Sequence, residues 1–387
     1  MTAPLYRHHK APEKFSNEGN AGLWFERFFN AYDKDFTEVA GAEQKKEWMK
    51  VLNCLVGNQA ELSRYAESQW ALVNTLNGEA RVYACDWRLV TGTGNPHPVE
   101  NGLSWHPVLG VPYISGAAVK GLVRAWLEEW HYGGDAQDAK KVRLRQWFGS
   151  DHKDSGERRE DVIAGGLIFF DAVPIQPVKL ITDIMTPHMG KWYEQGGKIE
   201  DVNNSPERVP ADWHSPTPIP FLVAEAPQLL FGIAPRNGLS ARRVNMEEVM
   251  GCLGNALQWL GAGAKTAVGY GRMSVNDGKT NDLKGTLETR RREEQRHNMT
   301  QEQRIIDELA VQLESDKAKN IKNPSGPLAE KLNAWVKAGV RWQAEDRLWL
   351  ADVAVNFYDY VGWGKPAKKK QREELIQKLR DGQVGVR

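Results

Sequence analysis

The sequence predicts an α+β protein: a ferredoxin-like (RRM-like) βαββαβ core with long loop insertions, plus helical N-terminal and C-terminal extensions. Strand-like segments and amphipathic helical segments alternate in the middle of the chain, whereas helical patterns dominate both ends. The order in the middle is β-α-β-β-α-β, which is the ferredoxin-like order. A chain of 387 residues has room for two or three domains, or for one domain with large insertions.

A change of hydrophobic period defines the first half of the core. Residues 81–90 (RVYACDWRLV) place Trp87 and three other apolar residues on one alternating face, which predicts a half-buried strand. In residues 116–130 the apolar side chains fall at helical spacing, and Ser115 can cap this helix. The short apolar run GGLIFFDA at 165–172 is typical of a strand.

The second half of the core repeats this alternation. Residues 219–234 (IPFLVAEAPQLLFGIA) predict one long strand or a pair of strands. Apolar residues then recur at helical spacing from Met246 to Leu260. A glycine-rich loop, Gly261–Gly271, leads into a last strand near residues 272–275.

Three domains are expected. The first, 1–78, consists of an N-terminal arm (1–20) and helices (43–76). The second, 79–278, is the core, with insertions at 91–115 and 173–218. The third, 279–387, is a C-terminal helical extension that is broken at NPSGP. The insertions are rich in Pro, His, Trp and Gly. Because long loops without regular structure are usually functional or disordered, we expect function in these insertions.

Charge, cysteine content and hydropathy exclude several classes of protein. The 51 Lys and Arg against 50 Asp and Glu give a net charge of +1, so bulk charge does not attract nucleic acid and a polyanion needs a local basic cluster. The three cysteines lie far apart without a CxxC pair, which favours neither disulfides nor zinc and fits a reducing compartment. With no apolar leader and no membrane-length apolar run, we expect a cytoplasmic protein without membrane contacts.

The strongest local signal is the glycine-rich loop Gly261–Gly271. Its four glycines permit close backbone approach, and successive N–H groups can cradle an anion. Lys265 and Arg272 supply charge, and Tyr270 offers a flat face for a base or sugar. A Walker A loop is excluded because Ala264 stands where that motif needs glycine, and a dinucleotide loop should follow a strand. The alternative is a glycine hinge between a helix and an edge strand.

The second signal is the start of the 116–130 helix. Gly116 and the small Ala117 and Ala118 leave its first turn uncovered, and a helix N-terminus attracts phosphate. Lys120 and Arg124 lie four residues apart, where like charges repel each other unless an anion lies between them. The alternative is two solvated basic side chains.

Together these segments resemble the RAMP superfamily of CRISPR proteins. The motifs are GVPYISGAAVKGLVR at 110–124 and GAGAKTAVGYGR at 261–272. Three further segments resemble one branch in particular, the sixth RAMP subunit of the type III-B (Cmr) effector complex. They are GTGNPHPVENG, GGLIFFDAVPI and DIMTPHMGKWY. The resemblance covers roughly residues 80–275. It departs from the family pattern at Ala117 and Ala118, where a small polar pair is common, so hydroxyl contacts to phosphate are lost there.

The resemblance implies a non-catalytic RNA-binding subunit of a type III CRISPR RNA-guided antiviral effector complex. Such a subunit holds the guide RNA backbone near its 3′ end and contacts neighbouring RAMP subunits. The expected partners are guide (CRISPR) RNA, other RAMP subunits and, as a further candidate, target RNA, with no cofactor and no metal. The candidate RNA-binding residues are Gly116, Ala117, Lys120, Arg124, Gly261, Gly263, Ala264, Lys265, Thr266, Tyr270 and Arg272, with His188 and Lys191 from the second insertion.

The histidines of the two insertions open an alternative function. His97, His106, His188 and His214 lie there, and metal-independent RAMP endoribonucleases that process guide precursors need an acid and a base. His188, with Lys191 nearby, is the best candidate; otherwise these histidines orient loops or stack on bases. A third interpretation is a protein-interaction scaffold, since 15 tryptophans favour partner contacts, although most, such as Trp126 and Trp130, are expected in the core.

Overall fold

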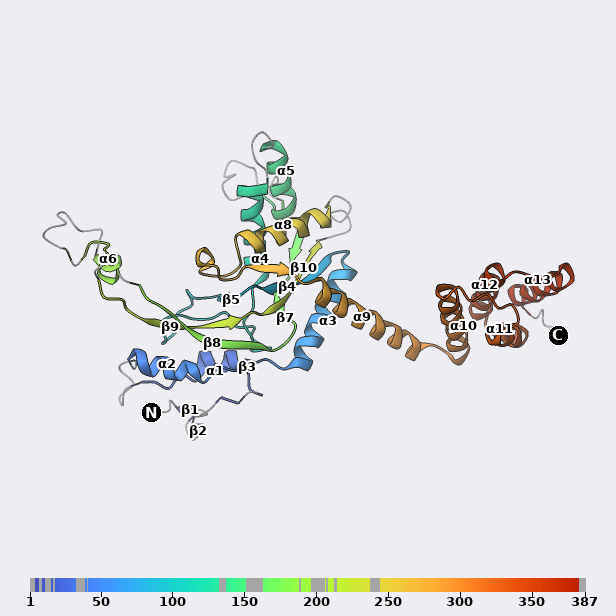
Figure 1. Cartoon of the computed structure of the whole chain (residues 1–387), viewed down its shortest axis with the longest axis horizontal. Coiled ribbons are helices and arrows are strands. Elements are labelled where there is room, and N and C mark those ends of the chain that lie inside the picture. The colour runs from blue at the N-terminus through green and yellow to red at the C-terminus, as the bar shows by residue number, and fades with distance from the viewer. Residues whose placement is uncertain are drawn as a thin grey trace. The chain divides into compact units, whose positions relative to one another are not determined.

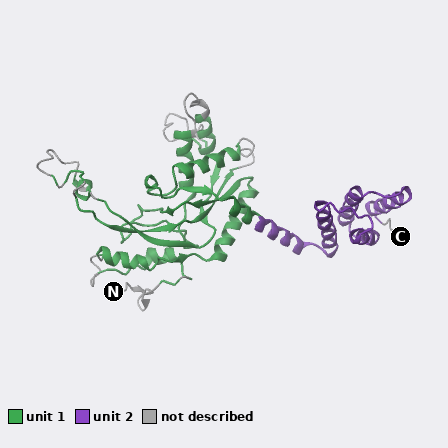
Figure 2. Ribbon diagram, viewed as in Figure 1, with its two compact units in different colours: residues 1–284 green, residues 285–387 purple. Residues whose placement is uncertain are grey.

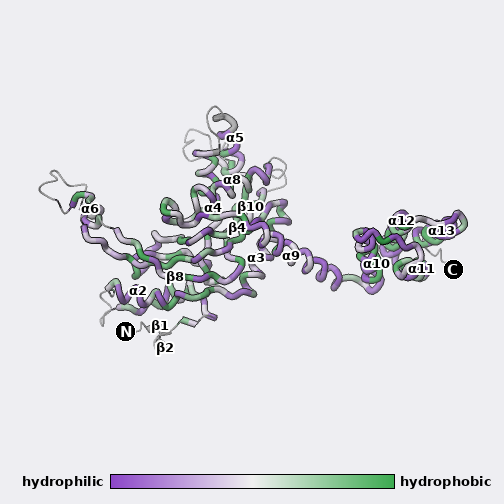
Figure 3. The backbone as a smooth tube through the Cα atoms, viewed as in Figure 1, coloured by the Kyte–Doolittle hydropathy of each residue, from purple (hydrophilic) through white to green (hydrophobic). Residues whose placement is uncertain are grey.

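The computed structural model forms two compact units, residues 1–284 and 285–387 (Figure 2). In each unit the hydrophobic residues concentrate in the packed helices and strands (Figure 3). The structure describes all residues except 1–3, 7–8, 11–14, 17, 33–38, 40, 132–136, 151–162, 188, 196–205, 207, 212–213, 237–243 and 383–387.

A first antiparallel sheet organises unit 1. Its strand order is β11 (Met273–Val275), β4 (Glu79–Cys85), β10 (Gln228–Pro235) and β6 (Leu167–Phe169), with β7 (Val173–Pro174) also paired to β10.

Helices cover both faces of this sheet (Figure 1). On one face α4 (Gly116–Trp126) packs against α8 (Met246–Trp259), and Gly254 of α8 lies beside Tyr83 of β4. On the other face α3 (Gln59–Thr75) crosses β10, where Gly232 lies next to Val73. The absence of a side chain at Gly232 lets α3 approach the sheet closely. The core of unit 1 therefore forms on both faces of this sheet.

A second antiparallel sheet has the order β3 (Leu55–Val56), β8 (Val178–Met185), β9 (Ile219–Glu225) and β5 (Arg88–Leu89). Helix α2 (Ala42–Lys50) packs on β8 and β9. Unit 1 also contains β1 (Pro4–Tyr6), β2 (His9–Lys10), α1 (Ala21–Arg27), α5 (Gln137–Phe148) and α6 (Gly190–Gln195).

Two bent strands connect the sheets. The segment predicted as one strand over 81–90 is interrupted at Trp87, so that β4 lies in the first sheet and β5 in the second. Opposite this bend, β9 and β10 form the predicted pair of strands and are joined through Ala226, whose φ is 43°. The Ala226 N–H donates to the Trp87 carbonyl at 2.6 Å, which holds the two bends against each other.

Several predicted elements differ in the structure. The insertion 173–218 contains β7, β8 and α6, whereas the sequence predicted a loop without regular structure. The helical stretch predicted over 43–76 is interrupted by β3. Strands such as β8 take their hydrogen-bond partners from distant segments, and a local hydrophobic period does not reveal such pairing. In the predicted helix 116–130, α4 ends at Trp126 and a π-helical turn, Leu127–His131, follows.

Unit 2 is helical and has its own core. Its helices are α9 (Asp277–Asn298), which runs across the unit boundary, α10 (Gln301–Ala318), α11 (Pro327–Ala338), α12 (Ala344–Val361) and α13 (Pro366–Asp381). A capping box of Thr300 and Gln303 begins α10, and Pro327 of the NPSGP break begins α11. Buried residues such as Ile306, Leu350 and Phe357 form the core. The predicted α+β class is therefore confirmed.

Among the described helices, none combines the length and the apolar character that crossing a membrane requires.

Candidate nucleic-acid interface

The glycine loop adopts a left-handed backbone at five positions. The φ values are 74° at Gly261, 92° at Gly263, 59° at Lys265, 97° at Gly269 and 68° at Gly271. Glycine adopts such φ values without a steric penalty, so four of the five positions have the residue that their conformation favours. Lys265 is the exception, and it directly precedes a short 3₁₀ turn, Thr266–Val268.

Two of these glycines also permit close contacts within the protein. A Cβ atom on Gly271 would lie 1.8 Å from the Ala262 carbonyl oxygen, and a Cβ atom on Gly263 would lie 2.3 Å from the Val90 carbonyl oxygen. Real Cβ atoms do not approach oxygen so closely. Glycine at these positions is therefore explained by the packing of the loop itself.

Backbone hydrogen bonds fix the loop to itself and to β5. The Ala262 N–H donates to the Gly271 carbonyl at 2.9 Å, and the Ala264 N–H donates to the Val90 carbonyl at 2.8 Å. The Gly271 N–H donates to the Arg88 carbonyl at 2.7 Å. Because these three amides already have acceptors inside the protein, they are not available to a phosphate. The cradle that the sequence suggested for the rest of the loop stays a prediction.

Tyr270 points into the protein. Its side chain is only 6% exposed and its hydroxyl donates to Oδ2 of Asp183 in β8. Nη1 of Arg88 lies 2.5 Å from the same carboxylate oxygen. The flat face that the sequence attributed to Tyr270 is thus turned inward, and the exposed aromatic ring beside the loop is that of Trp87, which is 47% exposed.

The shared carboxylate changes the protonation equilibria of its neighbours. Burial alone would raise the pKa of Asp183, but hydrogen bonds from Tyr270, the Ile184 amide and Arg88 together hold this pKa below its usual value. Burial and the hydrogen bond to Asp183 raise the pKa of Tyr270. The carboxylate therefore stays ionised, and the phenol keeps its proton, at neutral pH.

The two cationic side chains of the loop differ in their surroundings. Nζ of Lys265 lies 5.4 Å from the ring centroid of Phe221 in β9, which is cation–π geometry, and Lys265 is half-buried. Arg272 is exposed, and its backbone carbonyl accepts a hydrogen bond from the Asp86 N–H at 2.9 Å. The hydrogen bond with Asp86 places the Arg272 backbone next to the bend at Trp87.

The start of α4 already contains an anionic group. The Gly116 N–H donates to Oδ1 of Asp171 at 2.6 Å, and the Ser115 hydroxyl oxygen accepts from the Ala118 N–H at 3.3 Å, as predicted for a cap. A Cβ atom on Gly116 would lie 2.2 Å from the Phe169 carbonyl oxygen. A carboxylate stabilises a helix N-terminus as a phosphate would, and Asp171 already occupies the Gly116 amide that was a candidate for RNA phosphate.

Lys120 and Arg124 have partners within the protein. Nζ of Lys120 donates to the Phe148 carbonyl at 3.4 Å, and Nε of Arg124 lies 2.7 Å from the Glu128 carboxylate. An anion between them is not needed to offset their repulsion. Ala117, one residue into the helix, is exposed.

Thr91 connects the two candidate segments. It is 6% exposed, and its hydroxyl donates to the Tyr113 carbonyl at 3.2 Å, two residues before the α4 cap. A Cβ atom on Gly263 would lie 3.1 Å from Cγ2 of Thr91. The glycine loop and the start of α4 are therefore neighbours of the same buried residue, whereas among the described residues no contact brings Lys191 of α6 to them.

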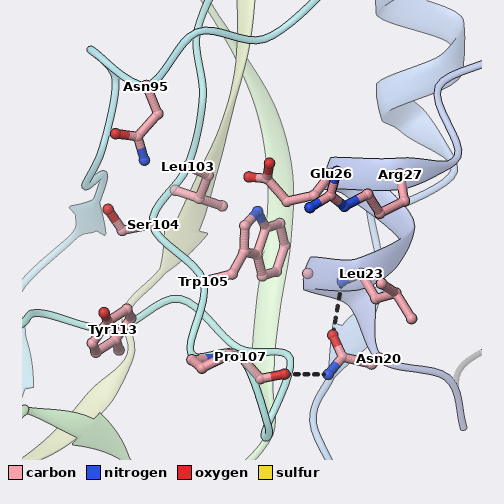
Figure 4. A pocket seen from close by; sticks show the side chains of 11 residues that line it. Asn20, Leu23, Glu26, Arg27, Asn95, Leu103, Ser104, Trp105, Pro107 and Tyr113 are labelled. Atoms are coloured by element: carbon pink, nitrogen blue, oxygen red, sulfur yellow. Dashed lines mark hydrogen bonds between the residues drawn. The ribbon is translucent and has the colours of Figure 1, made fainter.

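The insertion 91–115 is attached to α1 and encloses a pocket of about 340 Å³ with it (Figure 4). Asn20 caps α1 by accepting from the Leu23 N–H at 2.8 Å, and its Nδ2 donates to the Pro107 carbonyl at 3.0 Å. Glu26 and Arg27 of α1 also line this pocket, so its wall is partly charged. The Asn20 cap thus ties the N-terminal region to the insertion.

The histidines of the insertions make structural contacts where they are described. Nε2 of His97 lies 2.8 Å from the Phe25 carbonyl oxygen, and its ring stacks on Phe25 with centroids 4.0 Å apart. His106 is buried and accepts from the Leu109 N–H at 3.2 Å. Burial lowers the pKa of both histidines, which keeps them neutral. Nε2 of His214 donates to the Val209 carbonyl at 2.9 Å.

The second insertion supplies one described candidate. His188 lies outside the described residues. Lys191 lies in α6 and is exposed. No cluster of three or more His, Cys, Asp or Glu side chains suited to a metal occurs in the part of the chain that the structure describes.

Sequence reasoning missed Trp87, Arg88 and Asp183. The alternating pattern of 81–90 placed Trp87 on the buried face, but the bend at this position breaks the period and turns its ring outward. Trp130 was likewise expected in the core, yet it is 61% exposed in the π-helical turn after α4. The sequence signal that could have indicated the site around Trp87 is the presence of polar residues within an otherwise apolar strand pattern.

Comparison with known proteins supports the predicted resemblance. Residues 88–274, which contain α4, α8 and the glycine loop, match the model of the RAMP superfamily. The predicted resemblance to this superfamily is therefore confirmed.

The sequence relatives lie in one branch of it. The chain is 28% identical to the CRISPR system Cmr subunit Cmr6 of Pyrococcus furiosus over 256 residues, which are 54% of this chain and 72% of that protein. It is 30% identical to the Cmr6 subunit of Saccharolobus solfataricus over 94 residues, which are 24% of this chain and 27% of that protein. The predicted resemblance to the sixth RAMP subunit of Cmr complexes is confirmed.

Two solved structures were also matched. The crystal structure of Cmr6 from Pyrococcus furiosus aligns at 25% identity with a TM-score of 0.29, covering 51% of this chain and 98% of that chain. The cryo-EM structure of the type III-B Cmr-beta bound to cognate target RNA aligns at 17% identity with a TM-score of 0.43, covering 60% of this chain and 72% of that chain.

Proposed function

We propose that this protein is a non-catalytic, RNA-binding subunit of a type III CRISPR RNA-guided antiviral effector complex. The observation that carries the proposal is the match to Cmr6 of Pyrococcus furiosus over 72% of that protein's length. The subunit binds the backbone of the guide RNA near its 3′ end and contacts neighbouring RAMP subunits. Guide RNA is the main nucleic-acid partner, and target RNA is a second one.

The scaffold for this function is a ferredoxin-like core. Its elements follow in the order β4, α4, β6 with β7, β10, α8 and β11, which is βαββαβ. In the sheet, the last strand lies beside the first, and the first lies beside the third. Both helices lie on one face, and this arrangement supports the ferredoxin-like assignment.

Side-chain charge, rather than loop amides, provides the RNA contact in this proposal. The amides of Ala262, Ala264 and Gly271 donate within the protein. Lys265 and Arg272 lie at the loop and its exit, and Lys191 adds an exposed charge on α6. Because the protein's net charge is only +1, such local cations must supply the attraction for phosphate.

The proposal is tested by measuring the affinity of the full-length protein for single-stranded RNA by fluorescence anisotropy. Several sequences of equal length are compared at three salt concentrations. Backbone binding predicts that affinity falls with rising salt and depends little on sequence. An affinity that varies more than about a hundredfold with sequence at constant salt contradicts backbone binding, and the absence of any binding contradicts the proposed function.

The alternative function, a metal-independent endoribonuclease, has less support. Burial lowers the pKa of His97 and His106 and keeps both neutral. Hydrogen bonds hold the His97 ring against α1 and the His106 ring within the insertion. We expect no cleavage when the full-length protein is incubated with guide precursor or target RNA in EDTA. Cleavage that is lost in His188→Ala but kept in His214→Ala would favour the alternative.

A further inference from the structure

An exposed tryptophan stands at the bend between the two sheets. Trp87 is 47% exposed, although indole is among the side chains that gain most from burial. The bend does not leave the residue loose, because its carbonyl accepts the Ala226 N–H at 2.6 Å. The backbone of Trp87 is therefore fixed at the surface.

Two neighbours orient this ring. Cζ of Arg88 lies 4.5 Å from the centroid of the Trp87 ring, which is cation–π geometry. The ring of Tyr270 lies 5.0 Å away, centroid to centroid, at an interplanar angle of 53°. These contacts brace the indole from the protein side and leave the remainder of its surface open to solvent.

One carboxylate holds both neighbours. Oδ2 of Asp183 accepts from Nη1 of Arg88 at 2.5 Å and also from the Tyr270 hydroxyl. Asp183 is mostly buried, with an 18% exposed side chain. The charged guanidinium is thus fixed on the indole, and the negative charge that fixes it lies inside the protein.

Two cations, Arg272 and Lys265, lie on the side of the indole that faces the glycine loop, and the exposed Asp86 precedes Trp87 there. The Asp86 N–H donates to the Arg272 carbonyl at 2.9 Å, which places the exposed Arg272 next to the bend. Lys265 lies on Phe221, whose ring is 6.3 Å from that of Tyr270. An aromatic surface beside cations suits a nucleotide, which offers a base to the ring and a phosphate to the charges.

We propose that Trp87 is a stacking platform for one nucleobase of single-stranded RNA, oriented by Arg88 and Tyr270 through Asp183. The proposal rests on the proposed RNA-binding function and adds a residue that the motifs did not indicate. Stacking tolerates any base, since every base has a flat face, so it agrees with RNA binding that is independent of sequence. The flanking cations favour RNA over an apolar protein partner.

Three variants of the full-length protein test the proposal. Trp87→Ala removes the ring, Trp87→Phe keeps an aromatic face, and Trp130→Ala is a matched control at a residue that is 61% exposed outside the site. Stacking predicts that Trp87→Ala weakens binding of single-stranded RNA by about 5- to 100-fold. Trp87→Phe keeps most of the affinity, and Trp130→Ala binds like the parent.

An abasic oligonucleotide distinguishes stacking from other causes of lost affinity. The parent protein should bind abasic RNA more weakly than ordinary RNA. Trp87→Ala should bind abasic and ordinary RNA with the same affinity, and this affinity should equal that of the parent for abasic RNA. The salt dependence of Trp87→Ala should equal that of the parent, because no phosphate contact is removed.

RNA affinity in Trp87→Ala equal to that of the parent would overturn the stacking role while leaving the proposed function in place. If this variant also no longer joined neighbouring subunits, the surface would be a protein interface. A parent protein that binds no RNA would overturn the stacking role and the proposed function together.

Discussion

Tyr270 and Asp183 are joined by a hydrogen bond in which the phenol hydroxyl donates to the carboxylate. Tyr270 ends the glycine loop, which leads to β11 of the first sheet, and Asp183 lies in β8 of the second sheet. The contact therefore fixes the loop relative to both sheets. Because Arg88 also binds Asp183, a single ionised carboxylate holds one side chain from the loop and one from β5.

The first prediction concerns Asp183→Asn. The replacement removes the charge shared by Arg88 and Tyr270, and we expect a loss of about 1–2 kcal/mol in the free energy of unfolding at pH 7, less than for a fully buried pair. The pKa of Asp183 is lowered in the folded protein, so its stabilising contribution is complete above the unfolded pKa of about 3.9. It is lost as pH falls through the folded value.

The measurement is urea unfolding of the parent and Asp183→Asn between pH 7 and pH 2.5. Other carboxylates titrate in both proteins, so the difference between the two curves isolates Asp183. We expect this difference to be constant above about pH 5 and to shrink below about pH 4. A difference that grew on acidification would contradict the lowered pKa.

The second prediction compares two glycines of α4. A Cβ atom at Gly116 would lie 2.2 Å from the Phe169 carbonyl oxygen, whereas a Cβ atom at Gly121 meets no atom within 4 Å. Gly121→Ala should stabilise the protein by about 0.5–1 kcal/mol, because glycine weakens a helix interior. Gly116→Ala should destabilise it by about 2 kcal/mol or more through overpacking against the backbone.

Thermal unfolding followed by circular dichroism measures both effects. Opposite signs for the two variants are the expected result. A Gly116→Ala variant with the same melting temperature as the parent would contradict the close contact between α4 and Phe169. Unchanged RNA affinity in Gly121→Ala serves as a control for the fold.

The comparison of sequence and structure shows which features are locally encoded. The amphipathic period of α4 and α8 predicted both helices, because burial of one helix face determines the pattern. The sequence also indicated that the loop needs glycine, and attributed this need to binding of an anion. In the structure, the close contact of Gly271 with Ala262 explains the glycine at that position. The hinge alternative thus describes part of the loop correctly.

The contacts around Trp87 could not be predicted in the same way. Whether Trp87 is inside or outside depends on a bend in the strand, and that bend is held by Ala226, more than a hundred residues later. Asp183 lies in a strand whose partners are distant, so nothing near it in sequence marks its contact with Tyr270. Such features follow from tertiary pairing and not from local pattern.

The third prediction separates backbone conformation from close packing in the glycine loop. Gly269 and Gly271 both have a positive φ, at 97° and 68°. A Cβ atom added at Gly271 would lie 1.8 Å from the Ala262 carbonyl oxygen, whereas one added at Gly269 would meet no atom within 4 Å. Gly269→Ala should cost about 1 kcal/mol from backbone strain. Gly271→Ala should cost about 2–3 kcal/mol more, since the loop must open. Melting temperatures of the two variants test this, and equal losses would contradict the packing argument.

The fourth prediction concerns Lys265, whose φ of 59° is unusual for a residue with a side chain. Two replacements remove the same charge but differ in strain. Lys265→Gly should relieve the left-handed conformation and stabilise the loop by about 1 kcal/mol relative to Lys265→Ala. If Lys265 binds RNA phosphate, both variants should lose the same affinity, near the lower end of about 1.5–3 kcal/mol because the side chain is partly exposed, or roughly tenfold in Kd.

The two readouts therefore respond to different causes. Melting temperature should rank Lys265→Gly above Lys265→Ala, whereas RNA affinity should be equal in the two and below that of Lys265→Arg, which keeps the charge. A flattened dependence of affinity on salt should accompany the loss, because one phosphate contact fewer releases fewer counterions. Should both uncharged variants bind RNA like the parent, alone and in the assembled complex, Lys265 would have no role in RNA binding. Its cation–π contact with Phe221 would then be its only assigned role.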